Sequence, residues 1–279
     1  VAMSFLVILL VLWVEKFSAW RLRIQQDGPW LAQLQRLQQG GFQQAPWLCL
    51  ALLVLLPVLV LGLLLLVLEP LAYGWLALPV HLLVLIYSLG RGDLLAALGP
   101  FRDAWRRGDG QAAYHVAERD LSLEPEEGAE LLVQVQGHLL WQAYQSFFAV
   151  IFWYLLLGPM AALAYRLLAL SAEHAQQPAL RERAVQLRHA FDWLPARVLT
   201  SSFALVGNFV AVSRALLHEL LSWDISAAQL VIKAGRAAAE MPPPVMGEEG
   251  VDTLDQLWQL LIRAAVVWYA GYAVWVLFI

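Results

Sequence analysis

Long apolar runs alternate with shorter polar segments along the chain, which is the pattern of a polytopic membrane protein. The clearest run covers residues 46–68. It has no charged side chain and is long enough to cross a bilayer, because a spanning helix needs about 20 apolar residues. Four further runs are predicted to cross as helices, at 3–17, 71–89, 141–165 and 257–279. The pattern therefore predicts an all-α integral membrane protein with about four to five transmembrane helices, forming a single domain over residues 1–279.

Three other stretches are less uniformly apolar. Residues 17–39 alternate apolar side chains with Arg and Gln, which predicts amphipathic interfacial helices interrupted at Gly28-Pro29. Residues 90–137 form a polar segment whose first part predicts two short amphipathic helices. Residues 198–221 carry Ser, Asn and His on one face, so they are predicted to form either a polar-faced span or an interfacial helix.

The distribution of Lys and Arg predicts the orientation, because positively charged loops stay in the cytoplasm. The loop 15–45 carries four such residues and the 69–71 turn carries none, so we expect the loop and the polar segment 90–137 to be cytoplasmic. Arg181, Arg183 and Arg188 would then lie outside if residues 139–165 crossed once. Either that segment is re-entrant around Gly158-Pro159, or the protein holds these arginines.

Composition supports a membrane protein and excludes several other classes. The chain is 61% hydrophobic and only 14% charged, whereas soluble domains are about a quarter charged. A net charge of −4 argues against nucleic acid as a partner. Cys49 is the one cysteine, and no Cys/His spacing predicts a metal site. No phosphate-binding loop or nucleophile elbow is present, so the sequence predicts no cofactor and no catalytic residues of those types.

The octet FDWLPARV, residues 191–198, places charged residues in an otherwise apolar region. Pro195 favours a helix that starts there, with Asp192 accepting hydrogen bonds from its first N–H groups. Trp193 suits the membrane interface. Arg197, one turn in, could pair with Asp192 or bind an anion. Asp192 and Pro195 are therefore a predicted structural helix entry, and Asp192, Trp193 and Arg197 are also candidate ligand-binding residues.

Arg119-Asp120 in the polar segment is a second candidate pair. Such pairs are usually solvated and contribute little to stability, which is the simpler interpretation. The alternative is that Arg119 and Asp120 contact the same ligand as the octet.

Three blocks together carry a resemblance to a known superfamily. They are Arg119-Asp120, the stretch IFWYLLLGPMAALAYR at 151–166, and FDWLPARV. In this order they resemble the CobD/CbiB family of membrane-bound cobinamide-phosphate synthases, and more closely its AmpE branch of regulatory proteins of Gram-negative bacteria. The acids and amides of the synthase pattern fall on other residue types here, namely Trp141, Gln142, Ala143, Gln145, Ala169, Leu170 and Ala172. Because Mg-nucleotide binding needs oxygen ligands, the resemblance implies a synthase fold without its catalytic set.

The resemblance implies a multi-pass protein of the bacterial inner membrane with a part in β-lactamase induction and peptidoglycan recycling. Its implied partners are the lipid bilayer, an anhydro-muropeptide amidase and an anionic small molecule. Two alternatives stay open. The first is an active ATP-dependent amide ligase, in which Asp120, Asp192, Glu173 and Arg197 would converge on one cavity. The second is a transporter with broken helices at Gly158-Pro159 and Pro57.

Overall fold

The computed structural model describes the chain except for residues 1, 18–19, 41–43, 91, 125–127 and 279. All regular secondary structure in the described residues is helical, which confirms the predicted all-α class. The chain divides into two compact units, and each is described by itself below. Unit 1 comprises Val1–Gly90, Ala149–Asp192 and Tyr272–Ile279, and unit 2 comprises Arg91–Phe148 and Trp193–Gly271.

Three helical segments of the described chain are long and apolar enough to cross a membrane. They are Pro46–Leu68, Glu130–Leu157 and Glu248–Phe278. Two shorter apolar helices cover Met3–Leu12 and Ala77–Ser88. These helices agree with an integral membrane protein, and the first of them matches the predicted span 46–68.

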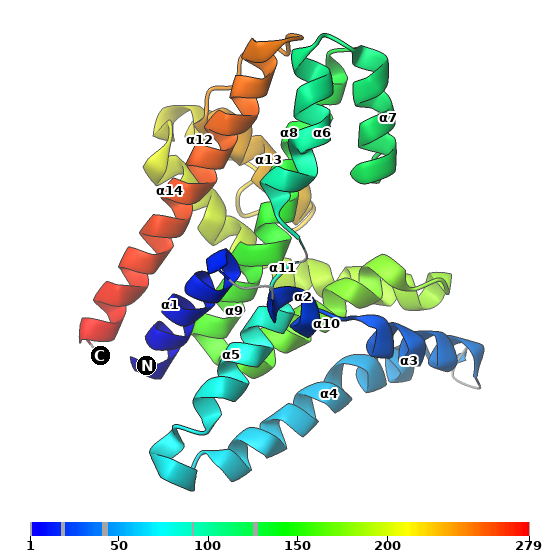
Figure 1. Cartoon of the computed structure of the whole chain (residues 1–279), viewed down its shortest axis with the longest axis vertical. Helices are drawn as coiled ribbons and strands as arrows, with labels where there is room; N and C mark the ends of the chain where they lie inside the picture. Colours follow the sequence, from blue (N-terminus) through cyan, green and yellow to red (C-terminus); the bar gives the residue numbers. More distant parts are fainter. Residues whose placement is uncertain (1, 18–19, 41–43, 91, 125–127, 279) are drawn as a thin grey trace. The chain divides into compact units, whose positions relative to one another are not determined.

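Unit 1 is built from helices near the N-terminus and from the middle of the chain. They are α1 (Ala2–Phe17), α2 (Trp20–Ile24), α3 (Gly28–Gln39), α4 (Pro46–Leu68), α5 (Ala77–Ser88), α9 (Ala149–Leu157), α10 (Pro159–His174) and the first part of α11 (Pro178–Val206). A short 3₁₀ turn at Leu71–Gly74 joins α4 to α5 (Figure 1). α10 packs against α9, α4 and α5, so it lies at the centre of this unit.

The predicted amphipathic character of residues 17–39 is confirmed for α3. Trp30 and Leu34 lie on its buried face, in one core cluster with Cys49, Leu50 and Leu53 of α4. The indole Nε1 of Trp30 also donates to the Leu53 carbonyl at 3.2 Å. The cluster buries the apolar face of α3 against α4, and burial of apolar area drives this packing.

Unit 2 contains the polar segment and the C-terminal half of the chain. Its helices are α6 (Leu94–Arg106), α7 (Gly110–Asp120), α8 (Glu130–Ala143) with a π turn at Tyr144–Phe148, the rest of α11, α12 (Phe209–Leu216), α13 (Ala227–Ala238) and most of α14 (Glu248–Phe278). α6 and α7 are the two short amphipathic helices that the sequence predicts. Asp93 and Asp109 cap them by accepting hydrogen bonds from backbone N–H groups of their first turns.

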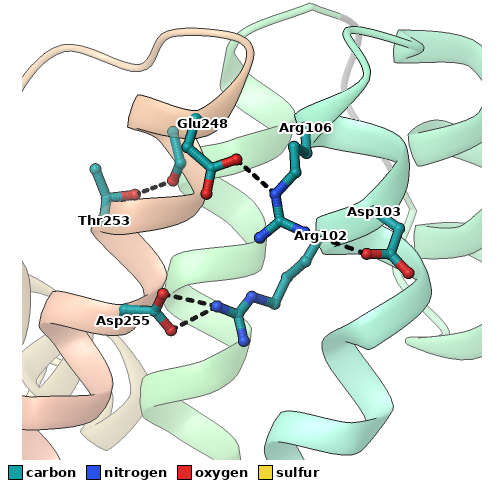
Figure 2. A network of polar contacts seen from close by, with 7 residues as sticks. Arg102, Asp103, Arg106, Glu248, Thr253 and Asp255 are labelled. Carbon is teal, nitrogen blue, oxygen red and sulfur yellow. Dashed lines mark hydrogen bonds and ion pairs between the residues drawn. The ribbon is translucent and has the colours of Figure 1, made fainter.

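A network of ion pairs fixes the start of α14 to α6, as Figure 2 shows. Arg102 Nη2 lies 2.6 and 2.7 Å from the two carboxylate oxygens of Asp255, and Arg106 Nε lies 2.5 Å from Glu248. Beside them, the indole of Trp105 donates to the Val245 carbonyl at 3.0 Å. The two ion pairs therefore connect α14 to α6, and the buried indole of Trp105 holds the segment just before α14.

Two of the predicted single helices are interrupted. The stretch 141–165 breaks at Gly158, whose φ of +84° lies in the left-handed region that favours glycine, and Pro159 then starts α10. The stretch 198–221 breaks at Gly207-Asn208. There Asn208 caps α12, and the backbone of Gly207 approaches Ala238 so closely that a Cβ would lie 2.6 Å from its carbonyl oxygen. The first break lies at the Gly158-Pro159 position where the sequence indicated a re-entrant segment, and the second divides the single helix predicted over 198–221.

Parts of several predicted segments lie outside the described residues. They are residues 18–19 of the amphipathic stretch, 41–43 of the loop 15–45, 91 and 125–127 of the polar segment, and 279 of the last predicted span.

Candidate functional site

Asp192 lies in a buried polar cluster of unit 1 at the contact between α10 and α11. Its side chain is only 3% exposed and accepts a hydrogen bond of 2.7 Å from the hydroxyl of Tyr165. Its second oxygen lies 3.4 Å from Nε of Arg188, one turn earlier on α11. Arg188 also lies 3.6 Å from Glu173, near the end of α10. A buried carboxylate is tolerated only with such partners, so the cluster stabilises the packing of α10 on α11.

The protonation states in this cluster follow from its burial. Burial raises the pKa of Tyr165 well above its usual value, and the negative charge of Asp192 raises it further. Burial alone would lower the pKa of Arg188, but Tyr165, Asp192 and Glu173 together raise it. Tyr165 therefore remains a neutral hydrogen-bond donor, and Arg188 remains a cation.

The neighbour of Tyr165 makes a second buried polar contact in unit 1. Arg166 is 7% exposed, and its Nη2 lies 3.9 Å from the carboxylate of Asp27, just before α3. Asp27 also accepts a hydrogen bond of 3.0 Å from the hydroxyl of Tyr87 on α5. The dipeptide Tyr165-Arg166 thus ties α10 to α11 on one side and to α3 and α5 on the other.

The predicted helix entry at Pro195 was wrong. Pro195 lies inside α11, a helix of 29 residues that begins at Pro178. Proline removes one backbone donor, which costs about 3 kcal/mol in a helix interior unless the surroundings compensate. Here the good helix formers that precede it and the buried side chains on both sides of it maintain the helix. Asp192 is therefore an interior side chain that binds Tyr165, and not the cap of a helix start.

Trp193 and Arg197 belong to a different cluster, in unit 2. Arg197 is 6% exposed, and its guanidinium lies over the ring of Trp193 at 4.2 Å. Its Nη1 donates to the Trp193 carbonyl at 2.8 Å, and its Nη2 donates to the Ser222 carbonyl at 2.5 Å. Trp193 in turn stacks on Trp223, with ring centroids 6.5 Å apart. Arg197 and Trp193 therefore hold the turn that carries Ser222 and Trp223 against α11.

Arg119 and Asp120 lie at the exposed end of α7 and bind each other. Nε of Arg119 lies 2.6 Å from Oδ1 of Asp120. This hydrogen bond lowers the pKa of Asp120 from its usual value. The geometry matches the solvated pair that the sequence offered as the simpler interpretation.

We predict that Arg119→Ala leaves the free energy of unfolding unchanged. The pair is exposed, so water replaces the lost contact and no buried charge is left unpaired. Unfolding by denaturant in mild detergent would be measured, with Arg107→Ala as a control in the turn that follows α6. A loss of more than about 1 kcal/mol for Arg119→Ala alone would contradict the assignment of a solvated pair.

The candidate ligand-binding residues take part in three sets of contacts, each within one unit. Asp192 joins the Tyr165 cluster, Trp193 and Arg197 hold the Ser222 turn, and Arg119 and Asp120 pair with each other. The sequence analysis missed Tyr165, Arg166 and Arg188 as site residues. Tyr165 and Arg166 end the stretch IFWYLLLGPMAALAYR at 151–166. Two polar residues at the end of an otherwise apolar stretch are the signal that would have identified them.

A comparison with family models finds one that covers most of the chain. The model described as regulatory signalling modulator protein AmpE matches residues 3–238. No curated protein and no solved structure matches. The match runs through the Tyr165 cluster, the Arg197 cluster and α13. The chain belongs to the AmpE family of regulatory signalling modulator proteins.

Proposed function

We propose that the protein is a multi-pass regulator of the bacterial inner membrane that tunes β-lactamase induction to the state of peptidoglycan recycling. In this role it works alongside a cytosolic anhydro-muropeptide amidase. The observation that carries the proposal is the AmpE family match over residues 3–238. The apolar helices Pro46–Leu68, Glu130–Leu157 and Glu248–Phe278 support a location in the bilayer.

The orientation follows from the distribution of positive charge. Loop 15–45 and the polar segment 90–137 are cytoplasmic in this proposal, because loops rich in Lys and Arg stay inside. Of the three arginines that would lie outside in this orientation, Arg188 is paired with Asp192 and Glu173, and a paired arginine is not a free topological signal.

We further propose that the chain is a catalytically degenerate relative of the cobinamide-phosphate synthases. The positions that the resemblance pairs with synthase acids and amides include Ala143, Ala169, Leu170 and Ala172, which are buried apolar side chains. Gln145, also among them, donates to the Gln142 side chain at 2.8 Å. Hard cations need oxygen ligands, and these side chains supply few of them. The chain would therefore keep the fold and regulate through binding instead of catalysis.

The experiment compares induction in a strain without the gene and in the same strain with the full chain on a plasmid. β-lactamase activity is measured over a range of inducer concentrations. We expect deletion to shift the inducing concentration and the plasmid to restore it. An induction curve that is unchanged by deletion would contradict the regulatory role.

The alternative of an active ligase is tested separately with the purified full chain. The protein is incubated with ATP, Mg²⁺, an amine and a carboxylate, and nucleotide cleavage is measured. We expect no cleavage above that of the detergent blank. Cleavage that depends on the amine would contradict the degenerate assignment and leave the membrane location standing.

A further inference from the structure

A hollow in unit 2 lies next to the turn that Arg197 holds. It measures about 730 Å³, within the usual range of small-molecule sites. Its walls come from α13 and from the turns between α12 and α13. Six of its lining side chains are polar or charged: Glu219, Ser222, Asp224, Gln229, Lys233 and Arg236. The hollow is therefore bordered by charges of both signs.

Two of these charges already neutralise each other. Nζ of Lys233 lies 2.7 Å from Oε2 of Glu219, and both side chains are about half exposed. The other two charges, Arg236 and Asp224, form no ion pair with each other in the described part of the chain. One positive and one negative group thus remain available on the walls of a single hollow. A ligand that carries both charges would complement them.

Arg236 is held in place by a chain of buried hydrogen bonds. Its Nε donates to Oε1 of Gln136 at 3.2 Å, and Gln136, only 1% exposed, donates through Nε2 to the hydroxyl of Thr253 at 2.8 Å. Thr253 donates onward to the Gly250 carbonyl at 2.6 Å. Among the described residues, Nε is the atom of Arg236 that makes a hydrogen bond, so its two Nη groups remain available to donate. A fixed guanidinium fork is the arrangement that binds a carboxylate with two hydrogen bonds.

The turn that carries Ser222 and Asp224 is also held in place. Arg197 binds the Ser222 carbonyl, and Trp193 stacks on Trp223, so the turn that presents Asp224 is fixed against α11. The backbone N–H of Asp224 donates to the Ser222 hydroxyl at 3.2 Å. Because Arg236 on α13 and Asp224 on the preceding turn are both held in place, less entropy is lost when a ligand binds.

We propose that this hollow binds a small zwitterionic ligand, for which unblocked short peptides serve as probes. Arg236 binds the ligand's carboxylate, and Asp224 binds its ammonium group. Arg197, Trp193, Gln136 and Thr253 are positioning residues that act through Ser222, Trp223 and Arg236. The proposal rests on the proposed regulatory function, since it names the class of signal that the regulator would bind.

The hydrogen-bond chain also gives binding a route to α14. Thr253 and Gly250 lie in the first turns of α14. Figure 2 shows Thr253 on the helix that carries Glu248 and Asp255, the partners of Arg106 and Arg102 of α6. A ligand that binds the guanidinium of Arg236 changes the hydrogen bond between Arg236 and Gln136. That change alters the hydrogen bond between Gln136 and Thr253. The start of α14 is therefore the element that we expect to respond to binding.

Unblocked alanine peptides of two to four residues serve as probes for the purified full chain in detergent. Each peptide is compared with its N-acetylated and its C-amidated form by isothermal titration calorimetry. We expect at least one unblocked peptide to bind and each capping to weaken its binding by roughly tenfold, the value of one lost charged contact of about 1.4 kcal/mol. No binding by any unblocked peptide, or equal binding by capped and unblocked forms, would overturn the proposal.

Two variants test which residue binds which end of the peptide. Arg236→Gln is expected to weaken binding of the unblocked peptide tenfold, and C-amidation should then cause no further loss. Asp224→Asn is expected to weaken binding of the unblocked peptide tenfold, and N-acetylation should then cause no further loss. Asp224 is exposed, so its variant is expected to fold normally. Arg214→Gln on α12, outside the hollow, is the matched control and should bind like the wild type. An unchanged affinity in both hollow variants would overturn the assignment.

Thr253→Val and Thr253→Ser test the positioning chain. Valine keeps the shape but removes the hydroxyl that accepts from Gln136, so it is expected to weaken the unblocked peptide and spare the amidated one. Serine keeps the hydroxyl and is expected to restore binding. Equal affinities of Thr253→Val and Thr253→Ser for the unblocked peptide would show that the Thr253 hydroxyl does not position Arg236. If binding fails while deletion still shifts β-lactamase induction, the hollow is refuted and the proposed function stands.

Discussion

Asp192→Ala is expected to destabilise the protein by about 3 kcal/mol, because it leaves a buried arginine without its nearest carboxylate. Arg188 would lose its contact with Asp192 and keep the longer contact with Glu173, and the Tyr165 hydroxyl would lose the carboxylate to which it donates. An unmade hydrogen bond in an apolar site adds to the cost. Unfolding by denaturant in mild detergent, followed by tryptophan fluorescence, measures the loss, and membrane abundance in cells should fall with it.

Two control variants separate charge from hydrogen bonding in this cluster. Asp192→Asn can still accept from Tyr165 but lacks the charge, so its loss of stability should be intermediate. Glu182→Ala removes an exposed acid from the same helix and should change stability little. Wild-type stability of Asp192→Ala would show that the cluster does not hold α10 to α11.

Gly250→Ala is expected to have an effect of similar size in unit 2. A Cβ at this position would collide with the Val245 carbonyl oxygen and with Nε1 of Trp105, two atoms that are hydrogen-bonded to each other. The variant must shift the backbone or break that buried hydrogen bond, and we expect a loss of about 3 kcal/mol. The same denaturant titration and membrane abundance report it.

Gly271→Ala is the matched control on the same helix. No atom lies within 4 Å of the Cβ it would add. Alanine is also the better helix former, so this variant should be as stable as the wild type or slightly more so. Equal stability of Gly250→Ala and Gly271→Ala would mean that α14 does not depend on its close approach to Trp105.

The sequence predicted the helical class and the helix at 46–68 correctly, because both depend on composition over many residues. An uncharged apolar run such as 46–68 has few alternatives, since backbone polar groups in a bilayer must bond within a helix. The amphipathic helices at 94–106 and 110–120 were also predictable, because their polar periodicity and their Asp caps are local signals.

The breaks in the other helices were harder to predict. Gly158-Pro159 was recognised as a possible re-entrant point, but its left-handed φ is a property of the folded chain. At Gly207 the break depends on a close approach to Ala238, more than thirty residues later. Such contacts between distant segments leave no signature in the local pattern.

The candidate site shows the same limit. Local rules assign Pro195 to a helix start, but tertiary packing keeps it inside α11. FDWLPARV was correctly singled out as unusual, and its residues contribute to two clusters instead of one. The partners of those residues, Tyr165 and Ser222, come from distant parts of the chain, and the sequence alone could not pair them.

The most direct test of a regulator that responds to a ligand is β-lactamase induction in the deletion strain carrying Arg236→Gln. Arg214→Gln is expressed in parallel, and inducer curves are compared at equal membrane abundance of the two variants. We predict that Arg214→Gln restores the wild-type curve and that Arg236→Gln remains like the deletion. A wild-type curve from Arg236→Gln at equal abundance would contradict the account.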